Sequence, residues 1–395
     1  MKNNILYRAV RAMFSACQVE LLHFFSDKAL KSTFLVMTFI VAFLNSSIYN
    51  GEIIEKTPIS VVNLDKGSMS RNLIRMLNAT QQVKVFSVST DMNEAKKQFH
   101  EGKVFGILVI PEDFEQKLSR GYQASLSLYS DASNMLHNKA VAGAAASVTG
   151  VFNAQLEINK SLHSGLNYEN SVGSRRSVAA ISKPVFNPYG GYGTFLLPVV
   201  YLVVLQTLLL TSIGVLSGTF REKNQYFKLY NIPESIHIRI IPVLIGRALA
   251  YLLLCILVFS SICGIAFTVF KLPFRSSYWS VIVYLIPFFL AVIFLGFSLM
   301  GIFKRREDAA MSVTFISTPA VFLTGISWPV AAFPEWVKVL AYVFPSTLGA
   351  RGFLCLSQFQ ARLGDITDLW GQLWLTAGFY FIIAVLINYR LKMSK

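Results

Sequence analysis

Long apolar runs separated by charged segments constrain the fold of this sequence more than any other feature. Only 14% of the 395 residues are charged, and charged residues are nearly absent from these runs rather than evenly reduced in number along the whole chain. Such runs cross a hydrocarbon core of about 30 Å as helices. The sequence therefore predicts a polytopic α-helical membrane protein with six transmembrane helices. The runs lie at residues 33–49, 195–218, 243–270, 280–303, 311–330 and 372–389.

The positions of lysine and arginine predict how the chain crosses the membrane. A net charge of +15 can indicate nucleic-acid binding, but no basic stripe is interleaved with base-stacking aromatic residues, so no nucleic acid is expected. The basic residues gather before the first run, between the second and third, after the fourth and in the C-terminal tail. By the positive-inside rule these segments are cytoplasmic. We expect a multi-pass protein of the bacterial inner membrane with both termini in the cytoplasm.

The segment 51–193 has a different composition and predicts an inserted extracytoplasmic α/β domain. Four short β-like runs alternate with helical stretches, a pattern typical of a small sheet covered by helices. A long helix over 133–164 and a linker over 168–193 follow. The expected strands are 58–63, 83–88, 104–110 and 125–129, and the expected shorter helices are 68–78, 91–102 and one from Pro111 to Gly121.

The remaining segments complete the predicted organisation. Residues 1–31 form an amphipathic helix on the cytoplasmic side, which either lies in the membrane interface or covers the flank of the bundle. Residues 32–50 form the first span, and 194–395 contain the other five. Arg247 is the one charged residue inside these runs, and we expect it to extend to water at the cytoplasmic end of its helix. Because the runs contain no acidic residue, proton- or sodium-coupled antiport is disfavoured.

No motif predicts chemistry on this chain. The motifs G-x-x-x-x-G-K-[ST], H-E-x-x-H and G-x-S-x-G are all absent. The five histidines are scattered, and the spacing of the four cysteines suits neither a disulfide framework nor a zinc site. We therefore expect no catalytic residue, no metal and no cofactor here. Any use of ATP must depend on another polypeptide.

The stretch 221–247 is the most informative cytoplasmic segment. It links two spans, and its aromatic and aliphatic residues lie between charges up to Pro233, which ends the predicted helix 221–233. By pattern alone, this helix either binds a groove on a partner protein or lies at the lipid interface.

Several short motifs resemble those of the type-2 ABC transporter permeases, in the branch with a large outer domain after the first span. Glu222 and Pro233 match the cytosolic E-R-G-T-x-E-x-L-x-x-T-P motif in register, although Asn224-Gln225 replaces Gly-Thr. LTGISWP and VFPSTLGARGF resemble segments between the last two spans of that family. In the inserted segment the matching residues are Asp65, Ser70, Pro111, Phe114, Asp131 and Asn134.

The resemblance implies a permease subunit that exports hydrophobic or amphiphilic molecules, either drugs or lipid-like compounds. Its implied partners are an ABC ATPase subunit, a second permease protomer and, as a further option, a periplasmic adaptor. A competing hypothesis is a non-transporting surface receptor or assembly factor of the phage-infection-protein type, in which the outer domain does the work. The residues implied in contact with the ATPase are Arg221, Glu222, Lys223, Tyr226, Leu229, Ile232 and Pro233.

Glycine and proline residues predict broken helices at the outer membrane face. Irregular backbone at membrane depth occurs only where protein covers it or where it lines a cavity. We therefore expect an outer gate at 324–330. Its candidate residues are Thr324, Gly325, Trp328 and Pro329. For Asp65 and Pro111 in the inserted domain, we expect a structural role at strand ends and helix caps.

Overall fold

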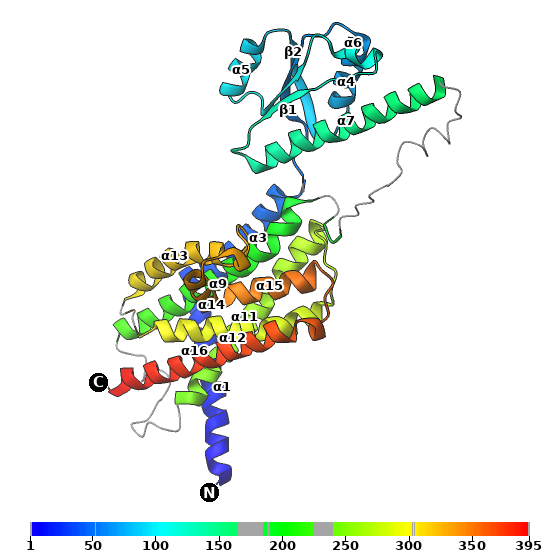
Figure 1. Ribbon diagram of the computed structural model, residues 1–395. Helices are drawn as coiled ribbons and strands as arrows, with labels where there is room; N and C mark the ends of the chain where they lie inside the picture. The colour runs from blue at the N-terminus through cyan, green and yellow to red at the C-terminus, as the bar shows by residue number, and fades with distance from the viewer. Residues whose placement is uncertain are drawn as a thin grey trace. The chain divides into compact units, whose positions relative to one another are not determined.

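The computed structural model describes residues 2–51, 53–163, 185–187, 190–223, 240–301, 303 and 305–393 (Figure 1). The chain forms two compact units, one of Met1–Glu52 with Val185–Lys395 and the other of Ile53–Pro184. The long apolar helices belong to the first unit and all four described strands to the second. Most of the predicted linker 168–193 lies outside the described residues.

Five helical segments of the described chain are long and apolar enough to cross a membrane. This finding confirms the predicted polytopic helical membrane protein. All five begin before the predicted run, and two of them, Tyr192–Glu222 and Leu363–Leu391, also extend past its end. The five are Lys28–Ile48, Tyr192–Glu222 (α9), Ile240–Val269 (α11, Ile240–Cys263, with a π-helical turn), Tyr278–Leu299 (α12) and Leu363–Leu391, most of it in α16 (Thr367–Met393).

The predicted run 311–330 does not form one continuous span. Helix α13 (Arg306–Leu323) begins with charged residues and ends at Leu323, because Gly325 takes a left-handed φ of 88°. The next two helices, α14 (Glu335–Val343) and α15 (Pro345–Ser357), are bent by 86° relative to each other. Together they form a broken span or a re-entrant loop, so that the described chain has five spans, or up to six if the bent pair counts as one.

Helix α12 lies at the centre of the helical unit. Its side chains Tyr284, Phe288, Phe289 and Phe297 are completely buried. Helices α9, α11, α15 and α16 pack around it. The first span is the end of an N-terminal segment made of α1 (Lys2–Ser26), α2 (Lys28–Lys31), a π-helical turn Ser32–Val36 and α3 (Met37–Ile48).

Helix α1 packs along α11. Of the two alternatives that the sequence left open for this amphipathic helix, the structure shows the second, because α1 covers the flank of the bundle. Phe24 is completely buried, and its ring meets the edge of Tyr251 with centroids 6.4 Å apart.

The second unit is a small mixed sheet covered by helices on both faces. The strand order is β2-β1-β3-β4, with β1 parallel to β2 and β3, and β4 antiparallel to β3. Helices α4 and α7 pack on one face and α5 on the other. The bounds are β1 Thr57–Asn63, β2 Val83–Ser89, β3 Gly106–Ile110, β4 Ser127–Ser130, α4 Ser68–Asn78, α5 Met92–His100, α6 Phe114–Ser119 and α7 Met135–His163.

Candidate coupling site at the ends of helices α9 and α11

Arg221, Glu222 and Lys223 lie at the end of helix α9, where the predicted coupling segment begins. Arg221 Nη1 donates hydrogen bonds to the carbonyl oxygens of Met300 and Phe303, the second at 2.6 Å. Arg221 therefore holds the end of α9 against the end of α12. The side chains of Glu222 and Lys223 are exposed. The other residues predicted to contact an ATPase, Tyr226, Leu229, Ile232 and Pro233, lie outside the described residues.

A buried ion pair joins the N-terminal helix α1 to α11. Arg247 and Glu20 are 0% and 1% exposed, and Nε and Nη2 of the guanidinium each donate a hydrogen bond of 2.9 Å to the carboxylate. The expectation that Arg247 extends to water is therefore wrong. Glu20 supplies the negative charge and the acceptors that water would otherwise provide, and such bidentate geometry is what a buried charge requires.

The position of Glu20 within α1 is the feature that could have indicated this pair. The buried residues of α1 recur at helical spacing, and Glu20 falls on the same face as Ala16, Cys17 and Phe24. A carboxylate on the apolar face of a helix needs a cationic partner. Nothing local in the sequence identifies that partner, because it lies 227 positions further along the chain.

The guanidinium of Arg247, which is part of α11, contacts three other helices. Its Nη2 donates to Ser217 Oγ on α9 at 3.2 Å, and its Nη1 contacts Met300 Sδ at the end of α12 at 3.6 Å. The guanidinium carbon lies 4.5 Å from the ring centre of Phe297, also on α12. Together with Glu20 on α1, these contacts define a junction, which we call the Arg247 junction, that connects the end of α9 with the start of α11.

Close backbone packing fixes α1 beside this junction. A Cβ atom added to Gly246 would lie 2.1 Å from the carbonyl oxygen of Met13, so only glycine allows α1 to approach α11 this closely. His23 packs edge-on against Phe220 of α9, with ring centroids 5.0 Å apart. Close packing therefore fixes helix α1 beside α9 and α11, in addition to the ion pair between Glu20 and Arg247.

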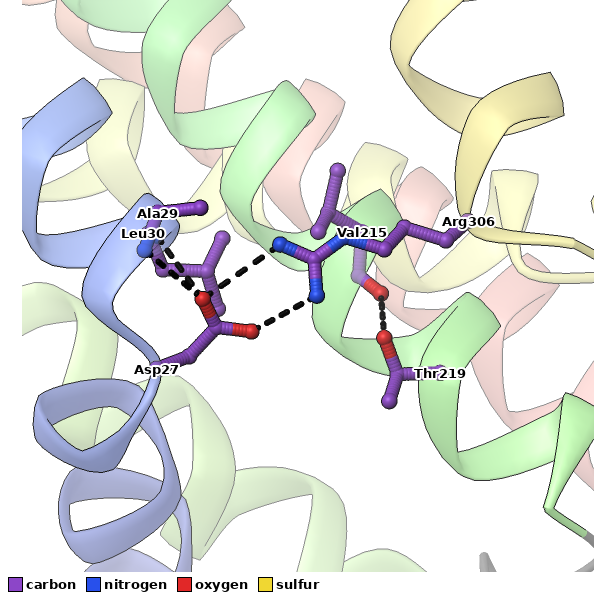
Figure 2. A network of polar contacts seen from close by, with 6 residues as sticks. All are labelled: Asp27, Ala29, Leu30, Val215, Thr219 and Arg306. Atoms are coloured by element: carbon purple, nitrogen blue, oxygen red, sulfur yellow. Dashed lines mark hydrogen bonds and ion pairs between the residues drawn. The ribbon is translucent and has the colours of Figure 1, made fainter.

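A second ion pair connects the N-terminal segment to α13 (Figure 2). Arg306 donates to Asp27 from Nη1 at 2.8 Å and from Nη2 at 3.3 Å. Asp27 also caps α2 by accepting hydrogen bonds from the backbone N–H groups of Ala29 and Leu30. Partial burial favours the neutral carboxyl, but the hydrogen bonds from Arg306 and the backbone outweigh it and lower the pKa of Asp27. The pair is therefore ionised at neutral pH.

The residues of the predicted outer gate lie between α13 and α14. Thr324 is buried, and its Oγ donates to the carbonyl oxygen of Val321 at 2.6 Å. Gly325 supplies the left-handed turn, and Pro329 precedes a short 3-10 helix. Trp328 is 62% exposed. These positions end α13 and redirect the chain toward α14.

Gln206 links α9 to the start of α15. Its Oε1 accepts from the backbone N–H of Ser346 at 3.0 Å, and its Nε2 donates to Ser346 Oγ at 3.2 Å. Gln206 is 2% exposed and lies 140 positions before Ser346, so the sequence offered no local indication of this contact.

We expect Gln206→Leu to lower the thermal unfolding midpoint of the purified protein. Loss of the side-chain amide leaves the buried N–H of Ser346 without its acceptor, at a cost of about 1–3 kcal/mol. Gln372→Leu is the matched control, because Gln372 is exposed on α16. Equal midpoints for the two variants, measured by scanning fluorimetry, would contradict this role of Gln206.

The motif residues of the inserted unit build its turns. Asp65 follows β1 and accepts from the backbone N–H groups of Gly67 and Glu115 at 3.0 and 3.4 Å. Ser70 is completely buried and donates to the carbonyl oxygens of Asp65 and Gly67. Asp65 therefore joins the loop after β1 to the start of α6. Ser70 fixes the same loop at the start of α4.

The other motif residues shape the loops after β3 and β4. Phe114 is 3% exposed and donates its backbone N–H to the carbonyl oxygen of Pro111, so α6 begins later than the sequence predicted. Asp131 Oδ1 accepts two hydrogen bonds from Ser133, which lower the pKa of Asp131. Asn134 caps α7.

Comparison with known proteins agrees with this architecture. Residues 28–386 match the model of a family described as "ABC-2 family transporter protein". The chain is 21% identical over 323 residues to the "Probable multidrug ABC transporter permease YbhR" of Escherichia coli strain K12, which covers 80% of this chain and 81% of that protein. The protein of the same name from Escherichia coli O157:H7 is equally similar. The chain is a transport subunit that belongs to the ABC-2 transporter family.

Proposed function

We propose that this chain is the membrane-spanning permease subunit of an ATP-driven exporter in the bacterial inner membrane, with both termini in the cytoplasm. One observation carries the proposal. This chain belongs to the ABC-2 family, but its sequence does not contain the loop G-x-x-x-x-G-K-[ST] that holds the phosphates of ATP. The energy then comes from a separate ATPase subunit. Its cargo is a hydrophobic or amphiphilic small molecule, in keeping with the description of the Escherichia coli relatives as probable multidrug permeases.

The Arg247 junction supports a route for this energy. The segment 224–239 connects α9 to α11, and Arg247 of α11 contacts α9, α1 and α12. A force on the segment therefore acts on four joined helices, which move together because packed cores do not deform continuously. The Asp27–Arg306 pair extends the connection to α13.

A groove between α9 and α13 fits an amphiphilic cargo. It has a volume of about 340 Å³, and the hydroxyls of Thr207, Ser317 and Thr318 lie among apolar side chains. Phe322, which lines the groove, is 58% exposed, and Phe315 on the same helix is 80% exposed. A second permease protomer packed on this face would enclose the groove, and cargo would leave past Thr324–Pro329, with an adaptor as a further partner.

The ATPase is expected to co-purify with this chain. Reversing the exposed charges in Glu222→Lys/Lys223→Glu should reduce the recovered ATPase on the order of tenfold or more, because misplaced charges at a docking surface repel the partner. The control reverses the ion pair of α14, in Glu335→Lys/Lys338→Glu, which lies outside the predicted coupling segment and should change nothing. Mass spectrometry of proteins bound to the tagged chain is the measurement. The proposal fails if the wild-type chain recovers no ATPase.

A further inference from the structure

The inserted unit contains a crevice of about 1000 Å³ at one end of its sheet. Asn63 and Ser89, the last residues of the parallel strands β1 and β2, line it together with one side of α4 and the start of α5. In open α/β sheets, ligands bind beyond the carboxyl ends of parallel strands. The crevice lies in this position and belongs to no part of the proposed transport route.

Three cationic side chains line the crevice, namely Lys66, Arg71 and Arg75. Arg71 Nη1 donates to the carbonyl oxygen of Lys66 at 2.6 Å, which fixes its guanidinium beside the loop after β1. The ammonium of Lys66 and the guanidinium of Arg75 have no hydrogen bond or ion pair with the part of the chain that the structure describes. Both cations are exposed, and their donors are available to a ligand.

The three acidic residues of the crevice are engaged within the protein. Asp65 accepts from the backbone at the starts of α4 and α6, and Asp91 accepts from the backbone N–H of Asn93 as the cap of α5. Glu94 accepts from Gln98 one turn further along α5. The three cations and three carboxylates of the lining cancel in formal charge, but the carboxylates already accept hydrogen bonds, whereas Lys66 and Arg75 keep their donors for a ligand oxyanion.

The crevice also has an apolar wall and an unsatisfied acceptor. Val88 on β2 is 53% exposed, and Ile74 faces the same space from α4. Among the described residues, Asn63 Oδ1 is buried without a hydrogen-bond partner. A buried acceptor of this kind takes a donor from outside the chain, such as a ligand hydroxyl or an ordered water.

We infer that this crevice binds an amphiphile that carries an oxyanion, either a phosphate or a carboxylate. Lys66 and Arg75 bind the oxyanion, and Ile74 and Val88 bind the apolar part. Charge-assisted hydrogen bonds to phosphate or carboxylate are the strong kind, and mixed apolar and polar linings are typical of small-molecule sites. The inference concerns binding alone and stands whether or not the export proposal holds.

Calorimetric titration of the full chain in nanodiscs tests the inference, with empty nanodiscs as reference. The probes are octyl phosphate, octanoate, inorganic phosphate and 1-octanol. Octyl phosphate or octanoate should bind, and the two arms distinguish a phosphate from a carboxylate ligand. Inorganic phosphate and 1-octanol should bind at least about tenfold more weakly, since phosphate lacks the apolar part and 1-octanol lacks the oxyanion.

Two double variants locate the binding. Lys66→Gln/Arg75→Gln should weaken binding of the anionic probe on the order of tenfold or more, and higher salt should weaken the wild type as well. Lys84→Gln/Lys96→Gln removes the same charge from exposed positions outside the crevice and should leave affinity unchanged. Equal loss in both variants, equally tight binding of inorganic phosphate, or no binding of either anionic amphiphile would overturn the inference.

Discussion

Glu20→Gln is expected to destabilise the helical unit by about 3–5 kcal/mol, because it leaves the buried guanidinium of Arg247 without a counter-charge. The thermal midpoint of the purified protein should fall accordingly. A thiol-reactive dye can follow the transition, since Cys255 lies completely buried on α11 and reacts only when the bundle opens. Arg247→Met should have an effect of the same order, since it leaves the carboxylate of Glu20 buried alone.

The double variant Glu20→Gln/Arg247→Met distinguishes the loss of the ion pair from the cost of leaving one charge buried alone. Since it removes both buried charges at once, it should recover much of the stability that either single variant loses. The matched control is Glu335→Gln, which removes the 88% exposed carboxylate from its ion pair with Lys338 and should cost at most about 1 kcal/mol. If Glu20→Gln melts at the wild-type midpoint, the Arg247 junction does not hold the helices together.

Gly246→Ala should release helix α1 from α11. The added Cβ would lie 2.1 Å from the carbonyl oxygen of Met13, and a backbone atom within a helix cannot move aside alone. Helix α1 must then shift, which also separates Glu20 from Arg247. We expect faster cleavage of α1 by a protease and a midpoint lowered as much as in Glu20→Gln.

The control for this variant lies on the same span. An added Cβ at Gly264 meets no atom within 4 Å, so Gly264→Ala changes the chain entropy by the same amount without a clash. Its protease sensitivity should match that of the wild type. Equal behaviour of Gly246→Ala and Gly264→Ala would mean that α1 does not pack on α11 as described.

The sequence predicted those parts of the fold that depend on local pattern. The apolar runs of α9, α11, α12 and α16 and the alternating strands β1 to β4 each carry their own periodicity, and their positions were predictable for that reason. The break after α13 was only partly predictable. Gly325 and Pro329 indicated irregular backbone, and Gly325 does end α13, but the apolar run continues to residue 330 and so predicted a span beyond the end of the helix.

The contacts that join the helices depend on pairs of residues far apart in the sequence. Glu20 and Arg247 are separated by 227 positions, and Gln206 and Ser346 by 140. Each member alone is an ordinary polar residue on a helix, and only the packing of α1 and α15 against their neighbours brings the partners together. Arg247 was therefore expected to extend to water although it lies in the middle of a buried junction.

Transport by inside-out vesicles tests the central claim most directly. The vesicles contain this chain with its co-purified ATPase, and uptake is measured for a panel of lipophilic dyes and fluorescent phospholipids. We predict ATP-dependent uptake of at least one compound, which is lost when the phosphate-binding lysine of the ATPase is replaced. Uptake that continues at the same rate with the inactive ATPase, or with this chain alone, would contradict an ATP-driven permease.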